Sequence, residues 1–396
     1  MINSDYCKRL LVIFVLAVSG YISPVFAVDL LEQPAIQSGA ATRTLLLDVT
    51  PRGDESFAAV GTYGVIIVSS DNGESWEQAE VPASVALTGV YFPTPESGWA
   101  VGHDGLILHS GDGGKTWQKQ LDGYQLNEQI LAVAKRIVAQ FQASLDDLES
   151  QEEPDEAASE EAQYQLEEAE FMLEGATDDT AAGPVRPLLD VWFRNEQEGY
   201  VVGSYGMLLH TNDGGQNWEL VSDRMDNPEA YHLNQITPAP DGALYIAGEA
   251  GFVFRSTDGG MSWDSLEPGY EGSFYGILVI PGAGDDYELL AYGLRGNLFS
   301  STDKGETWNA LNSGTSGTLM CGTLLDDGTV FLAGQGGTIL LRKPGQQNFS
   351  LAGNPDRRPI AGLAETDKGN VLLVGLGGIR EADAAGNPLV IPSVEQ

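Results

Sequence analysis

Cysteine and positive charge are both scarce in this chain. The sequence holds 2 cysteines, and 20 lysines and arginines stand against 57 acidic residues, which gives a net charge of −37. Cys7 lies in a segment that we expect to be removed, so Cys321 has no partner for an internal disulfide. Its apolar surroundings predict a small buried side chain. A surface this acidic repels nucleic acids and anionic lipids, so we expect neither as a partner.

Motifs for catalysis and metal binding are also missing. The 4 histidines never have the spacing of metal ligands, and the chain has no P-loop, nucleophile elbow, Cys-x-x-Cys or calcium loop. His109 and His210 occupy equivalent positions of a repeat, which predicts packing roles. We therefore expect no enzyme activity, no catalytic residues, no cofactor and no metal.

The chain has one N-terminal apolar run, residues 10–18, which is too short to span a bilayer comfortably. Lys8 and Arg9 precede it, and Val25-Phe26-Ala27 supplies the small residues of a cleavage site. This pattern predicts a signal peptide over residues 1–27 and a periplasmic mature protein, with an extracellular one as the alternative. Cys7 precedes the apolar run, so no lipid anchor is expected.

A Gly-x-x-Gly pair that follows a short apolar run occurs seven times. The pairs are separated by 41, 101, 45, 45, 41 and 41 residues and begin at Gly61, Gly102, Gly203, Gly248, Gly293, Gly334 and Gly375. A period in the low forties, with four short strands per unit, is typical of propeller blades. The sequence therefore predicts an all-β, seven-bladed propeller.

Five of these pairs lead into an Asp-box, Ser/Thr-x-Asp-x-Gly-x-Ser/Thr/Asn-Trp. The carboxylate of the box can accept hydrogen bonds from the turn, while the tryptophan packs between sheets. Blade six has a degenerate version over residues 342–349 with Phe349 in place of the tryptophan, and blade seven lacks the box. The structural residues predicted for the five boxes are Asp71, Trp76, Asp112, Trp117, Asp213, Trp218, Asp258, Trp263, Asp303 and Trp308.

The separation of 101 residues between the glycine pairs at Gly102 and Gly203 is too long for one blade, so it contains an insertion, which we place at residues 124–184. Apolar residues from Leu126 to Leu148 recur at spacings of three and four, and a second such segment covers about 157–173, so we expect a helical hairpin. The chain then divides into an N-terminal extension (28–42), blades 1–2 (43–123), the insertion, and blades 3–7 (185–396). Ring closure is expected from a strand at 387–393, or from the segment 28–36 added to blade seven.

The insertion and the tips of the glycine turns are the candidate partner-binding surfaces. Between Asp146 and Asp179 lie fifteen acidic residues and no lysine or arginine. The insertion is either a solvated decoration or a docking element that uses uncovered apolar side chains, and its place in the chain puts it over the glycine turns. The candidate residues are Phe141, Tyr164 and Phe171 in the insertion, and Tyr63, His103, Tyr205, Glu249, Arg295 and Gln335 in the turns.

The combined repeat, of which residues 201–218 are a close instance, resembles that of the Ycf48/HCF136 family within the BNR/Asp-box proteins. The resemblance implies an exported, non-enzymatic, seven-bladed factor that helps to assemble photosystem II. Only Arg295 falls in a turn tip, whereas photosynthetic members present an arginine patch. This difference indicates a resemblance to family members from non-photosynthetic bacteria. For such a member we expect a monomer whose partner is a membrane-protein complex of the cell envelope, such as an RND-class exporter.

Two other functions remain open at this stage. Asp-boxes also occur in sialidases, which makes a carbohydrate-binding protein or a divergent sialidase-like glycosidase an alternative, although the required arginine cluster is missing and Arg43 alone lies near the expected place. Assembly of photosystem II itself is the other alternative.

Overall fold

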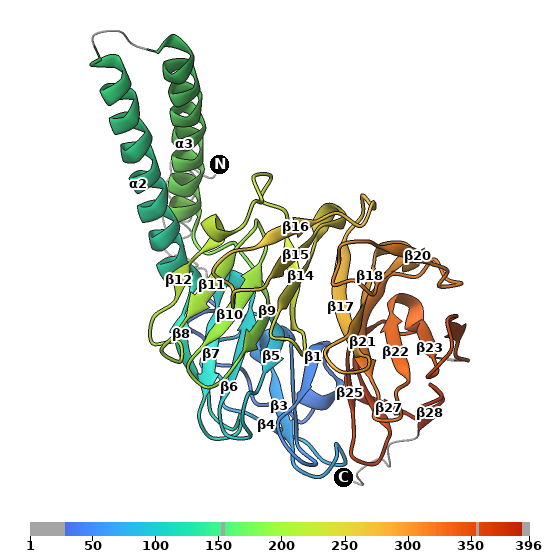
Figure 1. Cartoon of the computed structure of the whole chain (residues 1–396). Helices are drawn as coiled ribbons and strands as arrows, with labels where there is room; N and C mark the ends of the chain where they lie inside the picture. Colours follow the sequence, from blue (N-terminus) through green and yellow to red (C-terminus); the bar gives the residue numbers. More distant parts are fainter. Residues whose placement is uncertain (1–27, 152–154, 354–355, 390–396) are drawn as a thin grey trace, which may run out of the picture.

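The computed structural model describes residues 28–151, 155–353 and 356–389. Seven four-stranded antiparallel sheets form a ring, and a pair of long helices projects from it between the second and third sheets (Figure 1). The predicted seven-bladed propeller with a helical hairpin between blades 2 and 3 is confirmed. The predicted signal peptide lies outside the described residues. None of the helices within the described ranges is long and apolar enough to cross a membrane.

Each blade has its strands in sequence order from the centre of the ring outward. The inner strands are β1 (Leu46–Pro51), β5 (Leu87–Tyr91), β9 (Leu188–Phe193), β13 (Leu233–Pro238), β17 (Phe274–Pro281), β21 (Leu319–Leu324) and β25 (Ile360–Glu365). The second strands are β2 (Phe57–Gly61), β6 (Gly98–Gly102), β10 (Gly199–Gly203), β14 (Leu244–Gly248), β18 (Tyr287–Gly293), β22 (Val330–Gly334) and β26 (Val371–Gly375). The third strands are β3 (Ile66–Ser69), β7 (Ile107–Ser110), β11 (Leu208–Thr211), β15 (Val253–Ser256), β19 (Leu298–Ser301), β23 (Ile339–Arg342) and β27 (Arg380–Ala382). The outer strands are β4 (Glu77–Gln78), β8 (Gln118–Leu121), β12 (Glu219–Leu220), β16 (Asp264–Leu266), β20 (Asn309–Leu311), β24 (Ser350–Leu351) and β28 (Pro388–Leu389).

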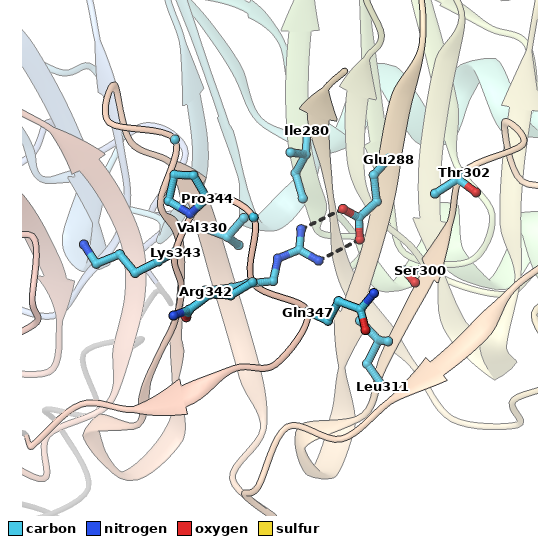
Figure 2. A pocket seen from close by; sticks show the side chains of 13 residues that line it. Ile280, Glu288, Ser300, Thr302, Leu311, Val330, Arg342, Lys343, Pro344 and Gln347 are labelled. Atoms are coloured by element: carbon cyan, nitrogen blue, oxygen red, sulfur yellow. Dashed lines mark hydrogen bonds and ion pairs between the residues drawn. The ribbon is translucent and has the colours of Figure 1, made fainter. Parts of the chain in front are cut away.

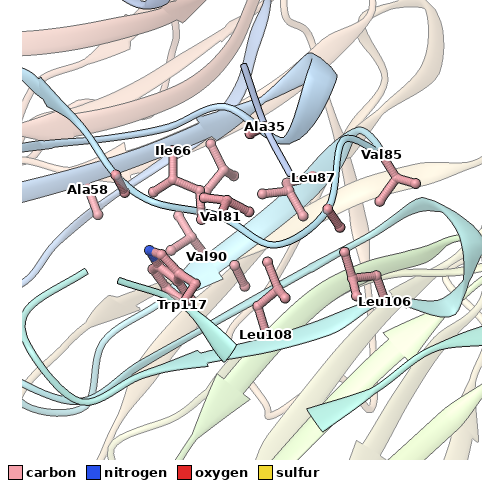
Figure 3. Packing of buried hydrophobic residues seen from close by; sticks show 14 of the residues in the cluster. Ala35, Ala58, Ile66, Val81, Val85, Leu87, Val90, Leu106, Leu108 and Trp117 are labelled. Carbon is pink, nitrogen blue, oxygen red and sulfur yellow. The ribbon is translucent and has the colours of Figure 1, made fainter. Parts of the chain in front are cut away.

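The second strands read as continuous apolar runs because both of their faces are covered by neighbouring blades. Every residue of β2, for example, is buried. Between blades 1 and 2, side chains such as Ile66, Val90 and Leu108 pack together with Trp117 from the Asp-box of blade 2 (Figure 3). The N-terminal segment contributes Ala35 to the same cluster. The tryptophan thus packs between sheets, as the sequence predicted.

The Asp-box acts as a hydrogen-bonded clasp around its own turn. In blade 1, the Ser75 amide donates to Asp71 over 2.9 Å, the Gly73 amide donates to the Ser69 hydroxyl over 3.0 Å, and the indole N–H of Trp76 donates to the carbonyl of Gly73 over 2.9 Å. Hydrogen bonds of this kind favour the ionised carboxyl. In blade 4, bonds from the Ser262 hydroxyl and amide lower the pKa of Asp258 to about 2.

Blade 6 replaces the clasp by an ion pair. Arg342 stands where the other boxes have serine or threonine, and its guanidinium donates to both oxygens of Glu288 on β18, over 2.8 and 2.7 Å (Figure 2). The same guanidinium lies 5.3 Å from the ring centre of Phe349, the residue that replaces the tryptophan. The degenerate box therefore remains a packing element, joined to blade 5 by charge.

The ring closes by packing between blades 7 and 1. β28 is the outer strand of blade 7, which agrees with the first of the two predicted closures as far as Leu389, the last described residue. The second predicted closure is wrong, because the segment 28–38 lies along blade 1, where the Ala35 amide donates to the carbonyl of Val81 over 3.0 Å. One of its two leucines, Leu31, is buried between blades 1 and 2, which accounts for this placement.

The insertion forms helices α2 (Gly123–Glu149) and α3 (Glu156–Ala182). The Asp122 side chain caps α2, and the Asn127 amide donates to the carbonyls of Asp179 and Gly183, which fixes the end of α3 to the start of α2. The second helix continues past the predicted end near residue 173. Its final turns are stabilised by this capping contact and by the burial of Ala176.

Candidate functional site: the turn face

The Gly-x-x-Gly turns all lie on one side of the ring, which we call the turn face. The first glycine is required by close backbone approach in six of the seven turns, and Gly248 is the exception. A Cβ atom on Gly334 would lie 2.0 Å from the carbonyl oxygen of Thr318 and 2.9 Å from the Cα atom of Leu319. The second glycine has a positive φ and meets a similar obstacle, since a Cβ atom on Gly251 would lie 1.6 Å from the carbonyl oxygen of Tyr270. The glycine pattern therefore reflects steric constraints of the fold.

The residue before the second glycine is also in the left-handed region, although most turns place a larger side chain there. The φ angles are 61° at Tyr63, 56° at Tyr205 and 56° at Arg295. This conformation is unfavourable for residues with a Cβ atom, by about 1 to 2 kcal/mol. The left-handed backbone of these residues was not predicted from the sequence. Strained residues that recur on one face of a protein are frequent at binding surfaces.

The predicted turn residues are spread around the ring. Tyr63 and Tyr205 leave 73% and 53% of their surface exposed. His103, Arg295 and Gln335 are exposed as well, whereas Glu249 is half-buried. No single site brings all of them together.

Tyr205 is held by its neighbours despite its exposure. The Arg186 guanidinium lies 5.0 Å from its ring centre, and its amide donates to Nδ1 of His232 over 3.0 Å. Arg186 also pairs with Asp179 of α3. The base of the hairpin is thus connected through Arg186 to the turn of blade 3.

The three predicted insertion residues differ in their surroundings. Tyr164 and Phe171 are exposed on α3, whereas Phe141 is half-buried against the cluster formed by Leu145, Ala162 and Leu166. The expectation that Phe141 is left uncovered is therefore wrong. It falls on the apolar stripe of α2 that faces α3, so it holds the hairpin together.

Each inner strand contains a β-bulge at the same place, which the sequence did not reveal. In β1, Leu46 pairs with Gly61 and Asp48 pairs with Val60, which leaves Leu47 between them. A bulge redirects a side chain and is frequent beside functional sites. The seven bulge residues are Leu47, Thr88, Leu189, Asn234, Tyr275, Met320 and Ala361.

A pocket of about 490 Å³ opens where these bulges reach the turn face. It is lined mainly by apolar side chains from blades 5, 6, 7 and 1. Its walls include the bulge residues Leu47, Tyr275, Met320 and Ala361 and the turn residues Leu294, Gln335 and Leu376. Concave apolar sites with a few polar groups are the usual form of a ligand-binding site. The hydrophobic turn residue Leu376 and the bulge pattern are the signals that sequence analysis missed.

Arginines lie on or next to the turns of the blades that line this pocket. Arg295 follows the pocket residue Leu294 in the turn of blade 5, and the Arg358 side chain packs against Gly377 in the turn of blade 7. The backbones of Arg357 and Arg43 pass close to Gly337 in the turn of blade 6 and to Gly378 in the turn of blade 7. Among the residues the structure describes, Arg43, Arg295 and Arg357 form no ion pair, whereas Arg358 pairs with Asp356 over 3.1 Å. Most of these arginines lie in links between blades, so inspection of the turn tips alone found only Arg295.

Two half-buried carboxyl groups, Asp48 and Asp190, lie on the inner strands next to the bulges. Asp48 accepts a hydrogen bond from the Val90 amide of blade 2, and Asp190 accepts one from the Ile236 amide of blade 4, each over 2.9 Å. Burial raises the pKa of Asp48 to about 6. Burial, with a smaller contribution from the charge of Asp48, raises the pKa of Asp190 to about 7. These groups join adjacent blades.

The remaining candidates for chemistry have structural surroundings. His109 lies 4.6 Å from Trp99 and His210 lies 4.6 Å from Tyr200, measured between ring centres, as expected of packing residues. Cys321 is buried, and burial raises the pKa of its thiol. Within the described ranges, no three histidine, cysteine, aspartate or glutamate side chains are grouped so that they could hold a metal ion.

Comparison with known proteins decides the family. The family model described as photosynthesis system II assembly factor YCF48 matches residues 31–109, 74–138 and 181–385, which together exceed half of the chain. The chain belongs to the YCF48 family. The match leaves out residues 139–180, most of the hairpin, so the known YCF48 repeat accounts for the propeller but not for this insertion. No curated protein sequence matches the chain.

Solved structures agree with this fold. A structure of YCF48 bound to a D1 peptide is 16% identical and covers 89% of this chain and 96% of its own, with a TM-score of 0.58. YCF48 from Cyanidioschyzon merolae is 15% identical and covers 89% of this chain and 98% of its own, with a TM-score of 0.55. The WD40 propeller domain of Doa1 is 10% identical and covers 90% of this chain and 96% of its own, with a TM-score of 0.56. At these identities the structures show the fold alone.

Proposed function

We propose that this protein is an exported, non-catalytic assembly factor that binds a segment of a membrane-protein complex at its turn face. The pocket on the turn face, with its apolar walls and with arginines on the neighbouring turns, carries the proposal. Arg43, Arg295 and Arg357, which form no ion pair among the described residues, are available to pair with an anionic group. The bound segment would therefore combine an apolar side chain with a carboxylate.

Family membership supports a role in assembly and the binding of a peptide. The family is described as an assembly factor, and a related structure is described as bound to a D1 peptide. For this chain, the client is an envelope membrane protein, either a photosystem subunit or a complex such as an RND-class exporter. Export through the predicted signal peptide would place the protein in the periplasm beside such a client.

Changing an exposed pocket residue tests the proposal. We expect Met320→Glu, at a side chain that is 39% exposed, to reduce the amount of client recovered with the protein by about tenfold, because it puts a charge into the apolar site. Recovery is measured by crosslinking in whole cells, affinity purification from solubilised envelope and quantitative mass spectrometry. The unchanged protein must recover more of a membrane-protein client than a parallel purification from a strain that lacks the protein.

Met261→Glu is the matched control. Met261 is 61% exposed and lies in the Asp-box of blade 4, away from the turn face. It should leave client recovery and circular dichroism unchanged. Equal recovery by the Met320 variant and the unchanged protein would contradict binding at the pocket. Turnover of a fluorogenic sialoside by the purified protein would contradict the non-catalytic role.

A further inference from the structure

The hairpin is a rigid projection whose inner side is already filled. Its two helices have 27 residues each, which corresponds to about 40 Å of length. Leu145, Ala162 and Leu166 form a buried cluster between them, and the contacts of Asn127 fix their base. In Figure 1 the hairpin stands away from the ring over most of its length. Its outer surfaces therefore remain available for a partner.

One outer surface of α3 has a regular pattern. Tyr164 and Phe171 are seven residues apart and leave 56% and 77% of their surface exposed. They lie on the side of α3 opposite to its buried residues Ala162, Leu166 and Ala169, as the helical period of 3.6 residues requires. We call this surface the outer stripe. Two large apolar side chains in line at heptad spacing are typical of a seam that packs against another helix.

Acidic residues flank the outer stripe with the same period. Glu160, Glu167 and Glu174 are exposed and follow one another at intervals of seven, and Glu161 and Glu168 border the other side. If Tyr164 and Phe171 take position d of a heptad, then Glu160, Glu167 and Glu174 all take position g, and Glu161 and Glu168 take position a. Charges at positions e and g select the partner of a helix in a coiled coil.

These carboxylates have no cationic neighbours. Among the described residues of α3, Asp179 alone takes part in an ion pair, with Arg186 at the base of the hairpin. The glutamates beside the stripe contact neutral groups instead, as when the Tyr164 hydroxyl donates to Glu168 over 2.6 Å. An uncompensated acidic surface accelerates association with a basic partner and disfavours an acidic one.

We propose that the outer stripe of α3 docks a basic amphipathic helix of a partner protein. The apolar side chains of that helix pack on Tyr164 and Phe171, and its lysines or arginines pair with Glu160, Glu167 and Glu174. A second copy of this chain does not fit, because it would place glutamates against glutamates. The acidic surface also repels anionic lipid headgroups. The inference rests on the proposed function and extends it to a second, charge-selective contact with the client.

A peptide with designed register tests the proposal. The probe is a synthetic peptide of about four heptads with leucine at a and d and lysine at e and g, whose own like charges oppose self-association. Its binding to the protein, residues 28–396, is followed by fluorescence anisotropy. We expect it to bind at least about tenfold more tightly than a peptide of the same composition with the leucines out of register. Its affinity should fall as salt is raised.

Variants of the stripe separate packing from charge. Tyr164→Ala with Phe171→Ala should remove the preference for the in-register peptide, and Glu160→Gln, Glu167→Gln and Glu174→Gln together should weaken binding about tenfold and reduce its salt dependence. Thr177→Ala is the control on the same helix, because Thr177 is exposed about a third of a turn away from the stripe and its hydroxyl donates to the Leu173 carbonyl. Circular dichroism checks that each variant keeps its helices.

Three outcomes would overturn the proposal. Equal binding of both peptides would show that net charge alone drives the association. Unchanged binding by the double alanine variant would show that the peptide does not contact Tyr164 and Phe171. A protein dimer in sedimentation that depends on Phe171 would identify a second copy as the occupant. None of these results depends on the pocket, so the Met320→Glu experiment tests the proposed function independently.

Discussion

Replacing Gly334 by alanine is expected to lower the free energy of unfolding by about 3 kcal/mol or more, because the new Cβ atom meets backbone atoms that cannot move aside. It would lie 2.0 Å from the Thr318 carbonyl oxygen and 2.9 Å from both Leu319 Cα and Met320 N. The relevant measurement is equilibrium unfolding in urea. The bulge at Met320 lies within the affected segment, so the pocket should be disturbed as well.

The same turn contains its own control. Gly336 has a φ of +68° and nothing within 4 Å of its Cβ position. Gly336→Ala should therefore cost only the strain of the left-handed conformation, about 1 kcal/mol. If the two variants were equally stable, the explanation of the first glycine by close approach would be wrong.

Replacing Asp48 by glutamine is expected to stabilise the protein at pH 8 by about 3 kcal/mol. Burial raises the pKa of Asp48 from 3.8 to about 6. The native protein therefore holds a proton that the unfolded chain has released, so the contribution of Asp48 to stability falls as the pH rises from about 4 to about 6. Glutamine has no such titration, and Gln235 already makes the equivalent bond, to the Ile277 amide over 2.9 Å.

Urea unfolding across pH 4 to pH 8 checks this expectation, in high salt so that the general acidity of the chain contributes little. The difference between the variant and the unchanged protein should vanish below about pH 4 and grow toward pH 6. The Asp-box carboxyls do not interfere, because hydrogen bonds hold the pKa of groups such as Asp258 at about 2. A difference that does not change with pH would show that Asp48 is already ionised near its ordinary pKa in the folded protein.

The sequence was sufficient for the architecture because the repeat imposes steric requirements. Few other residues can replace a glycine that lies against backbone, such as Gly334, or an Asp-box aspartate that binds its own turn, such as Asp71. These residues therefore recur in nearly every blade and can be recognised in the sequence. Ring closure was not equally visible. A leucine in the N-terminal segment can pack on any apolar groove, and nothing local to Leu31 indicates that this groove lies between blades 1 and 2.

The candidate site was predicted only in part. The positions of Tyr63, Tyr205 and Arg295 at exposed turn tips could be predicted because the tips follow directly from the repeat, and their role in binding stays a prediction. The pocket was missed because a bulge residue such as Met320 lies inside an ordinary strand pattern, and its direction depends on pairing with a strand more than ten residues away. Arg358 was missed because its proximity to the turn of blade 7 is a property of the closed ring.

The seam between blades 7 and 1 runs through the wall of the pocket. Within the described residues, each of these blades is built from four consecutive strands, so no strand is shared across the seam. The pocket is lined from both sides of it, by Leu45 and Leu47 of blade 1 and by Pro359 and Leu376 of blade 7. Because these walls belong to separate sheets, the width of the pocket depends on how blade 7 packs against blade 1 and not on the geometry of any single sheet.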